Sequence, residues 1–300
     1  MKKNPNKIKE GSPVATVLIY LFAAILGLIT VYPMYYVLIL SVSDPSAAAT
    51  MKVYTWPKGF NLASYKILVQ DKEMWHAYAN TFFYVITSVV LMLVTSVLGA
   101  FPLTYKGLRF RKLINMFLLI PMYISGGMIP SFLLILKLGL YNNPFSQIIP
   151  TCFSIWNIIL VKAFFSSIPE SMREAARIDG ANVYQTLFKI YLPMSKPILA
   201  VISVYTIVGV WNSWFNALVY LPKTTWQPLQ LYLRRVLVEN TQDLRQILDP
   251  ESAMQQVMRQ MSTAQLKYAM IIFTTLPVLF TYPFFQKYFV KGVMLGSLKE

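Results

Sequence analysis

The chain has 300 residues, of which 56% are hydrophobic and 13% are charged. Soluble domains carry about 25% charged residues, so this composition excludes an ordinary soluble protein and indicates an integral membrane protein. The formal net charge is +15, but Lys and Arg gather at the ends of apolar runs and form no basic or aromatic-basic module. We therefore expect the lipid bilayer as a partner and no nucleic acid.

Six apolar segments are long enough for a hydrocarbon core that needs about 20 residues per helix. They lie at residues 14–40, 78–103, 113–136, 148–165, 198–221 and 268–289. The first segment lacks the small-residue cleavage pattern of a signal peptide and predicts a retained span. We expect an all-α integral membrane domain of six transmembrane helices at 14–291, with an N-terminal segment at 1–13 and a C-terminal tail at 292–300.

Basic flanks predict the orientation of these spans, because short cytoplasmic loops are enriched in Lys and Arg. The basic residues are Lys2, Lys3, Lys7 and Lys9 before the first span, and Lys106, Arg109, Arg111 and Lys112 between the second and third. Both termini and the polar stretch at 167–196 are then cytoplasmic. The loops at 44–77 and 222–267 are then external; the second is basic, but long loops translocate largely regardless of charge.

The polar stretch that follows the fourth span predicts two short helices. Ser167 and Glu170 have the spacing of a capping box, with Pro169 in the first turn. Gly180 stands where a left-handed residue would end the first helix. Asn182 is the expected cap of the second helix, which has Gln185 three residues later and which we expect Pro193 to end.

The first of these short helices is amphipathic. Its small apolar face is expected to consist of Met172, Ala175 and Ala176, and its charged face of Glu170, Arg173, Glu174 and Arg177. Such a helix is suited to docking into a groove on another protein. The alternative is an amphipathic linker that lies on the bilayer surface.

The same stretch carries a signature: Glu174-Ala175-Ala176, three residues, Gly180, nine residues, Ile190, one residue and Leu192-Pro193. This pattern resembles the EAA motif of the membrane subunits of binding-protein-dependent ABC importers. "SVSDPSAA", "YANTFFYVITS", "GVWNSWFNALVYL" and the closing "YPFFQKYFVKGVMLGSLKE" are similar to the carbohydrate importer permeases. The nearest branch is that of oligosaccharide and polysaccharide importers related to the second maltose permease subunit.

The resemblance implies the type I ABC importer permease fold, with cytoplasmic EAA coupling helices at 167–193 that sit in a cleft of an ATPase subunit. The residues it marks for ATPase coupling are Arg173, Glu174, Ala175, Ala176, Asp179, Gly180, Ile190, Leu192 and Pro193. Secondary ATPase contacts are implied for Lys291, Gly292, Gly296 and Ser297 in the tail. For that tail, a disordered polar end is the alternative.

The resemblance also implies partners: a second homologous permease subunit, two copies of a cytoplasmic ABC ATPase and an extracytoplasmic sugar-binding protein, at a bacterial plasma (inner) membrane. The chain has no G-x-x-x-x-G-K-[ST] phosphate loop, so ATP and Mg are expected in the ATPase subunits and no cofactor in this chain. His76 is the single histidine and Cys152 the single cysteine, so we expect neither a catalytic set nor a metal site.

Polar and aromatic residues interrupt the fifth apolar segment and are candidates for the substrate pathway. They are Trp211, Asn212, Trp214 and Asn216, with Asn80 and Asn157 as weaker candidates in other segments. On a continuous helix, Asn212 and Asn216 would share a face. An indole beside amides suits a sugar ring and its hydroxyls. The alternative is that the Asn residues fasten helix to helix and the Trp residues belong to the external aromatic belt.

Two further patterns concern the third segment and the last external loop. Pro121, Gly126, Gly127 and Pro130 predict a broken helix in the third segment. In the loop at 222–267, an apolar stripe at helical spacing predicts a short helix that contacts the binding protein, guards the entrance or rests on the membrane. The stripe consists of Met254, Val257, Met258 and Met261.

These patterns together predict a permease subunit of an ATP-driven importer that translocates an oligosaccharide or a polysaccharide-derived glycan delivered by a binding protein. An importer for a peptide or another polar solute is the alternative within transport. A membrane-embedded enzyme acting on a lipid-linked glycan is the alternative from another class, but it requires a cluster of acidic or His residues at one interface, and none is evident.

Overall fold

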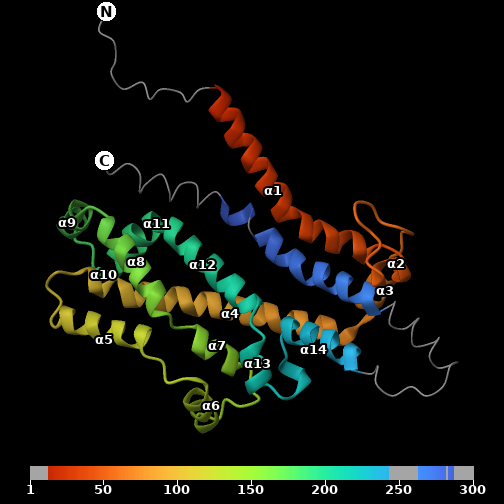
Figure 1. Cartoon of the computed structure of the whole chain (residues 1–300). Helices are drawn as coiled ribbons and strands as arrows, with labels where there is room; N and C mark the ends of the chain where they lie inside the picture. Colours follow the sequence, from red (N-terminus) through yellow and green to blue (C-terminus); the bar gives the residue numbers. More distant parts are fainter. Residues whose placement is uncertain (1–12, 243–262, 282, 287–300) are drawn as a thin grey trace, which may run out of the picture. The chain divides into compact units, whose positions relative to one another are not determined.

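The computed structural model describes residues 13–242, 263–281 and 283–286, and all regular elements within these ranges are helices (Figure 1). The chain divides into two compact units. The first comprises Met1–Gln70 and Asn240–Phe273, and the second Asp71–Glu239 and Thr274–Glu300. Each unit has its own cluster of buried apolar side chains.

The first unit begins with α1 (Pro13–Ser41), which is followed by α2 (Pro45–Ala49) and α3 (Ala63–Gln70). Most apolar side chains of α1 are exposed, as suits a helix that faces lipid or another protein. The buried Gln265 joins the polar parts of this unit: it accepts from Ser64 Oγ at 2.9 Å and donates to the carbonyl oxygens of Ser41 and Asn61. This buried amide is thereby satisfied.

The second unit is built on α4 (Lys72–Ala100), against which α8 (Ile155–Ser167) and α12 (Lys196–Trp211) pack (Figure 1). Asp71 caps α4 by accepting from the backbone N–H groups of Glu73 and Met74. Gly99 permits the close approach of α8, because a Cβ there would lie 3.1 Å from Ile158 Cδ1. A small residue thus allows α4 and α8 to pack closely at this point.

Shorter elements complete this unit. They are η1 (Pro102–Thr104), α5 (Arg111–Tyr123), α6 (Met128–Lys137), α7 (Phe145–Ile148), η2 (Ile149–Thr151), α9 (Glu170–Ile178), α10 (Val183–Thr186), the π-helical η3 (Leu187–Tyr191), α11 (Leu192–Met194), α13 (Phe215–Tyr220), η4 (Thr224–Trp226) and α14 (Leu229–Gln242).

Three helices within the described ranges are long and apolar enough to cross a membrane. They are Val14–Ser41, Lys72–Thr104 and Thr263–Gln286. Three bent pairs raise the number to six if each pair is one span: Arg111–Tyr123 with Met128–Lys137, Phe145–Thr151 with Ile155–Ser167, and Val183–Met194 with Lys196–Trp211.

The third apolar segment is broken, as its Gly and Pro pattern predicts. The two halves, α5 and α6, meet at 112°. Gly127 caps α6 with φ +83°, a conformation that side chains with a Cβ rarely adopt. Pro121 lies inside α5 without ending it, so the break falls at the glycines rather than at the proline.

Candidate functional site

The polar stretch after α8 folds as two short helices that meet at Gly180. This residue has φ +73°, the left-handed conformation expected of a helix-ending glycine. The N–H of Ala181 donates to the carbonyl of Ala176 and the N–H of Gly180 to that of Arg177, which together form a Schellman motif. The end of α9 is therefore fixed by backbone geometry.

The cap predicted for the second helix is confirmed. Asn182 Oδ1 accepts from the backbone N–H of Gln185 at 2.8 Å, and Gln185 Oε1 accepts from the backbone N–H of Asn182 at 2.8 Å. The prediction that Pro193 ends this helix misses by one residue, because the helical stretch from Val183 runs on through η3 and α11 to Met194. The chain then bends by 76° at Ser195, between α11 and α12.

The capping box predicted for the first helix is also wrong. Ser167 is the last residue of α8, and its hydroxyl donates to the carbonyl of Phe164 at 2.7 Å. Pro169 takes the N-cap position of α9 without a side-chain cap bond, so Glu170 has no capping role to share with Ser167. The carboxylate of Glu170 is used for ion pairs instead.

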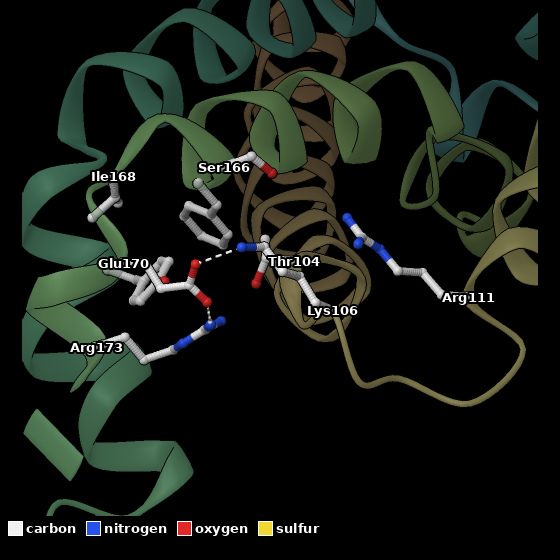
Figure 2. Close-up of a pocket in the computed structure, with 9 residues that line it drawn as sticks. Thr104, Lys106, Arg111, Ser166, Ile168, Glu170 and Arg173 are labelled. Atoms are coloured by element: carbon white, nitrogen blue, oxygen red, sulfur yellow. Dashed lines mark hydrogen bonds and ion pairs between the residues drawn. The ribbon is translucent and has the colours of Figure 1, made fainter.

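Glu170 joins α9 to the link between α4 and α5. Lys106 Nζ lies 2.7 Å from Glu170 Oε2, and Arg173 Nη2 lies 2.5 Å from Glu170 Oε1 (Figure 2). The hydrogen bond and charge of Lys106 are the main cause that holds the pKa of Glu170 below its usual value, with a smaller part from Arg173. The carboxylate is therefore ionised at neutral pH.

The ion-pair cluster lines a pocket of about 140 Å³ in the second unit (Figure 2). Its lining residues come from the α4–α5 link, α8, α9 and η3, and are Thr104, Lys106, Arg111, Phe165, Ser166, Ile168, Glu170, Arg173 and Tyr191. Arg111 Nε donates to the carbonyl of Leu103, which fixes that guanidinium at the start of α5. The pocket is where the first short helix meets the link between α4 and α5.

The faces of α9 differ from the prediction. Ala176 is buried and Arg173 turns inward, with its guanidinium 4.7 Å from the centroid of the Tyr105 ring. The expected apolar docking face is therefore only partly outward: Met172 and Ala175 are exposed, whereas Ala176 packs inside. The most exposed large apolar side chains of the loop are Ile178, Val183, Tyr184 and Phe188.

The remaining coupling candidates divide into exposed and packed residues. Glu174 and Arg177 line an open hollow of about 530 Å³ between α9 and α10, and Asp179 is exposed beside it. Ile190 and Leu192 are half-buried against the apolar core of the second unit, while Pro193 is exposed. The tail candidates Lys291, Gly292, Gly296 and Ser297 lie outside the described residues, as does the Met-rich stripe at 254–261.

Trp211 is built into the packing of the second unit. Its side chain is buried, and its indole N–H donates to the carbonyl of Thr274 at 3.1 Å. The edges of Tyr78 and Phe82 surround its ring. These contacts give Trp211 a packing role, an alternative that was expected for the Asn residues of this segment and not for its Trp residues.

The two amides of the fifth segment do not share a helix face, contrary to the prediction. The helix α12 ends at Trp211, the chain turns at Asn212, and α13 starts at Phe215. The amide of Asn212 donates to the carbonyl of Val208 at 2.9 Å, within its own chain segment. Asn212, Trp214 and Asn216 are nevertheless exposed around this break.

The weaker candidate Asn80 makes structural contacts near the start of α4. Its buried amide donates to the carbonyl oxygens of Thr225 and Gln227, at 2.9 and 3.1 Å. Tyr84 donates to the carbonyl of Trp226 beside it. These bonds fasten the segment after α13 to α4, and Asn157 is buried within α8.

Two contacts were not foreseen in the sequence. Lys162, in the apolar run of α8, donates to Asn115 Oδ1 of α5 at 2.6 Å; a lone Lys in an apolar segment is itself a signal of such a pair. Arg234 of α14 lies over the ring of Trp214, with 4.3 Å from Cζ to the centroid. Trp214 precedes α13 and Arg234 lies in α14, and no spacing rule connects residues in such separate segments. The contact between Arg234 and Trp214 therefore had no signal in the sequence.

Comparisons with known proteins agree with this architecture. Residues 96–295 match the family described as "Binding-protein-dependent transport system inner membrane component". The chain is 31% identical to Protein LplC of Bacillus subtilis, over 93% of this chain and 92% of that protein. It is 33% identical to the polygalacturonan/rhamnogalacturonan transport system permease protein YtcP of the same organism, over 94% and 97%.

A solved structure is also similar. It is described as a bacterial ABC transporter involved in the import of the acidic polysaccharide alginate, and the matching chain is 34% identical with a TM-score of 0.82. The match covers 92% of this chain and 96% of that chain.

Proposed function

This chain belongs to the family of binding-protein-dependent transport system inner membrane components, and on that premise we propose that it is a permease subunit for glycans. The substrate is an oligosaccharide or a polysaccharide-derived glycan, imported at the expense of ATP hydrolysed by other subunits. The observation that carries this proposal is the likeness to the alginate importer, 34% identical over 92% of the chain with a TM-score of 0.82. The similarity to a polygalacturonan/rhamnogalacturonan permease supports the same substrate class.

The assembly we propose has a second homologous permease, two cytoplasmic ATPase subunits and an extracytoplasmic binding protein in the bacterial plasma membrane. In this chain, three continuous helices and three bent pairs give up to six candidate spans. We count the last pair through α12 alone, because its first half, Val183–Met194, lies in the loop from α9 to α11. The basic flanks favour cytoplasmic termini. With an even number of spans, the loop from α9 to α11 then faces the cytoplasm, and the segment that begins α14 faces outward.

The loop from α9 to α11 is the proposed seat for an ATPase subunit. Its support is the exposed apolar set of Ile178, Val183, Tyr184 and Phe188 on a short, capped element, since exposed apolar patches mark protein interfaces. Glu174 and Arg177 add charge at its edge. The Schellman motif at Gly180 and the capping box at Asn182 keep the two helices in one fixed arrangement.

Movement of this loop can reach the membrane helices by two routes. One is the ion pair from Glu170 to Lys106, which leads to the end of α4 and the start of α5. The other is the covalent path through η3 and α11, whose Ile190 and Leu192 pack on the apolar core before α12 begins. A rigid element joined to several helices is what rocking of a transporter bundle requires.

We propose that the glycan contacts this chain at the break between α12 and α13. Asn212, Trp214 and Asn216 are exposed there, although the Asn212 amide also donates to the carbonyl of Val208. Trp211 and Asn80 are buried, with their polar groups engaged within the chain. Exposed amides and an indole suit the hydroxyls and ring faces of a sugar.

The test is reconstitution of the complete importer in proteoliposomes with its ATPase, second permease and binding protein. We expect ATP hydrolysis and uptake to rise when the binding protein carries an oligosaccharide. A chain that purifies without an ATPase or second permease, or a complex stimulated by peptides and by no glycan, contradicts the proposal.

A further inference from the structure

An arginine stacked on an exposed indole stands at the outer end of the proposed pathway. Arg234 Cζ lies 4.3 Å from the centroid of the Trp214 ring. Trp214 follows directly after α12, which runs for 16 residues from Lys196 and so spans about 24 Å. In the proposed orientation, that distance places the pair in the outer part of a hydrocarbon core about 30 Å thick.

The stacking leaves the hydrogen-bonding edge of Arg234 available. A guanidinium that lies over a ring uses its flat face there, while its N–H groups point outward in the plane of the fork. Arg234 is exposed and forms no ion pair within the described part of the chain. Its neighbour Arg235, by contrast, is paired with Glu73.

Among the side chains that the structure describes, no free carboxylate contacts Arg234. Two acidic side chains contact α14, and both are engaged: Asp71 accepts from the hydroxyl of Tyr232, and Glu73 pairs with Arg235. The described side chains from 222 to 237 include no Asp or Glu but include Lys223, Arg234 and Arg235, and the next acidic residue in the sequence is Glu239. The region around Trp214 is therefore suited to an anion.

We infer that Arg234 and Trp214 form a subsite for an acidic sugar, in which the guanidinium binds a uronate carboxylate and the indole contacts the pyranose ring. Exposed Asn212 and Asn216 are placed at the same break to meet hydroxyl groups. Arg binds carboxylates through two parallel N–H···O bonds, which makes the contact specific for a planar anion. This inference rests on the proposed function and adds to it that the glycan carries carboxylates.

The experiment compares two forms of one glycan: an oligogalacturonate as the free acid and the same oligomer with its carboxyls methyl-esterified. Each is supplied at a concentration that saturates the binding protein, and uptake and ATP hydrolysis are measured in the reconstituted importer. We expect Arg234→Gln to reduce uptake of the free acid by about tenfold and to leave uptake of the ester unchanged, since it removes a charged hydrogen bond that only the acid makes. Arg234→Lys should fall between, because it keeps the charge but not the fork.

Two control variants separate the subsite from general damage. Arg235→Gln removes the same charge from the same helix but breaks the pair with Glu73, so it should affect both glycan forms equally. Trp214→Ala should also reduce uptake of both forms, because the ring contact does not depend on the carboxylate.

The outcomes distinguish this inference from the proposed function. If wild-type importer takes up both forms and Arg234→Gln changes them equally or not at all, the subsite is refuted and the glycan permease stands. If no acidic or neutral glycan stimulates the complex, the proposed function fails and the subsite with it. If the effect of Arg234→Gln follows the presence of anionic lipid in the vesicles rather than the form of the glycan, Arg234 binds a lipid headgroup, and the subsite is again refuted.

Discussion

Lys106, in the link between α4 and α5, forms a 2.7 Å ion pair with Glu170 in the first turn of α9. If this pair transmits movement of the loop, Lys106→Met and Glu170→Gln should each lower glycan-stimulated ATP hydrolysis by a few-fold. The double variant should be no worse than Glu170→Gln alone, because that variant already removes the pair with Lys106 and, in addition, the pair with Arg173. Uptake and ATP hydrolysis in proteoliposomes measure the effect.

Lys112→Met is the matched control for these variants. Lys112 carries the same charge as Lys106 and lies nearby in the sequence, at the start of α5, but it has no ion pair among the described residues. It should leave hydrolysis unchanged. Additive losses for Lys106→Met and Glu170→Gln would mean that the two side chains act separately, against the coupling route proposed here.

The ion pair also has a defined pH dependence. Lys106 keeps the pKa of the folded Glu170 below that of the unfolded chain, which is about 4.3. Its contribution to stability is therefore complete above the unfolded value and is lost as the pH falls through the lowered folded value. The difference in thermal stability between wild type and Glu170→Gln should be constant from about pH 7 to pH 5 and shrink below about pH 4. A difference that disappears near pH 6 would exclude this carboxylate as the titrating group.

Gly180 has φ +73° and nothing within 4 Å of the position where a Cβ would stand. Substitution there is therefore penalised through the backbone, by about 1–2 kcal/mol for a left-handed residue, and not through steric collision. Gly180→Asn should be tolerated best, Gly180→Ala less well and Gly180→Val least, in that order of decreasing stimulated ATP hydrolysis. Membrane insertion should remain normal in all three.

Gly107 offers the control for this series. It lies in the link between α4 and α5, also with open space around its Cβ position, but without a left-handed φ. Gly107→Val should accordingly retain coupling. Wild-type stimulation of ATP hydrolysis in Gly180→Val would show that the bend does not need its left-handed residue.

The sequence predicted the local backbone of the loop better than the surroundings of its side chains. Gly180 and the pair of Asn182 and Gln185 obey rules that act within four residues, and both were foreseen. The capping role of Ser167 was wrong because α8 extends to that residue and uses its hydroxyl. The inward turn of Arg173 depends on Tyr105, a residue from a distant segment that no helical period reveals.

In the apolar segments, too, the local backbone was easier to predict than the surroundings of the side chains. The break in the third segment followed from Gly126 and Gly127, because glycines act on the backbone itself. The break after Trp211 was not predicted, since an apolar run with interspersed amides also fits a continuous helix. Whether Trp211 faces a pathway or a neighbour depended on Thr274, which lies far away in the sequence.

Asn80 should be required for the position of the segment that begins at Thr224. Asn80→Ala removes two hydrogen bonds to the carbonyls of Thr225 and Gln227 and should cost about 1–3 kcal/mol. Asn80→Asp should be worse, because a carboxylate oxygen then faces carbonyl oxygens. Hydrogen exchange of residues 224–232 measures the loss of protection. Asn157→Ala is the control, being a buried amide on α8, and equal exchange in all three variants would contradict the assignment.

Trp211 is predicted to stabilise the protein without selecting the glycan. Trp211→Phe keeps an aromatic ring between Tyr78 and Phe82 but removes the N–H that donates to the carbonyl of Thr274. Loss of one buried hydrogen bond should lower stability by about 1–3 kcal/mol, which a thermal unfolding scan in detergent can detect. The ratio of uptake between different glycans should stay at its wild-type value, because the indole does not reach the exposed surface at Asn212. A changed ratio in Trp211→Phe would return this residue to the substrate pathway, whereas unchanged stability would mean that the bond to Thr274 contributes nothing to the packing of the second unit.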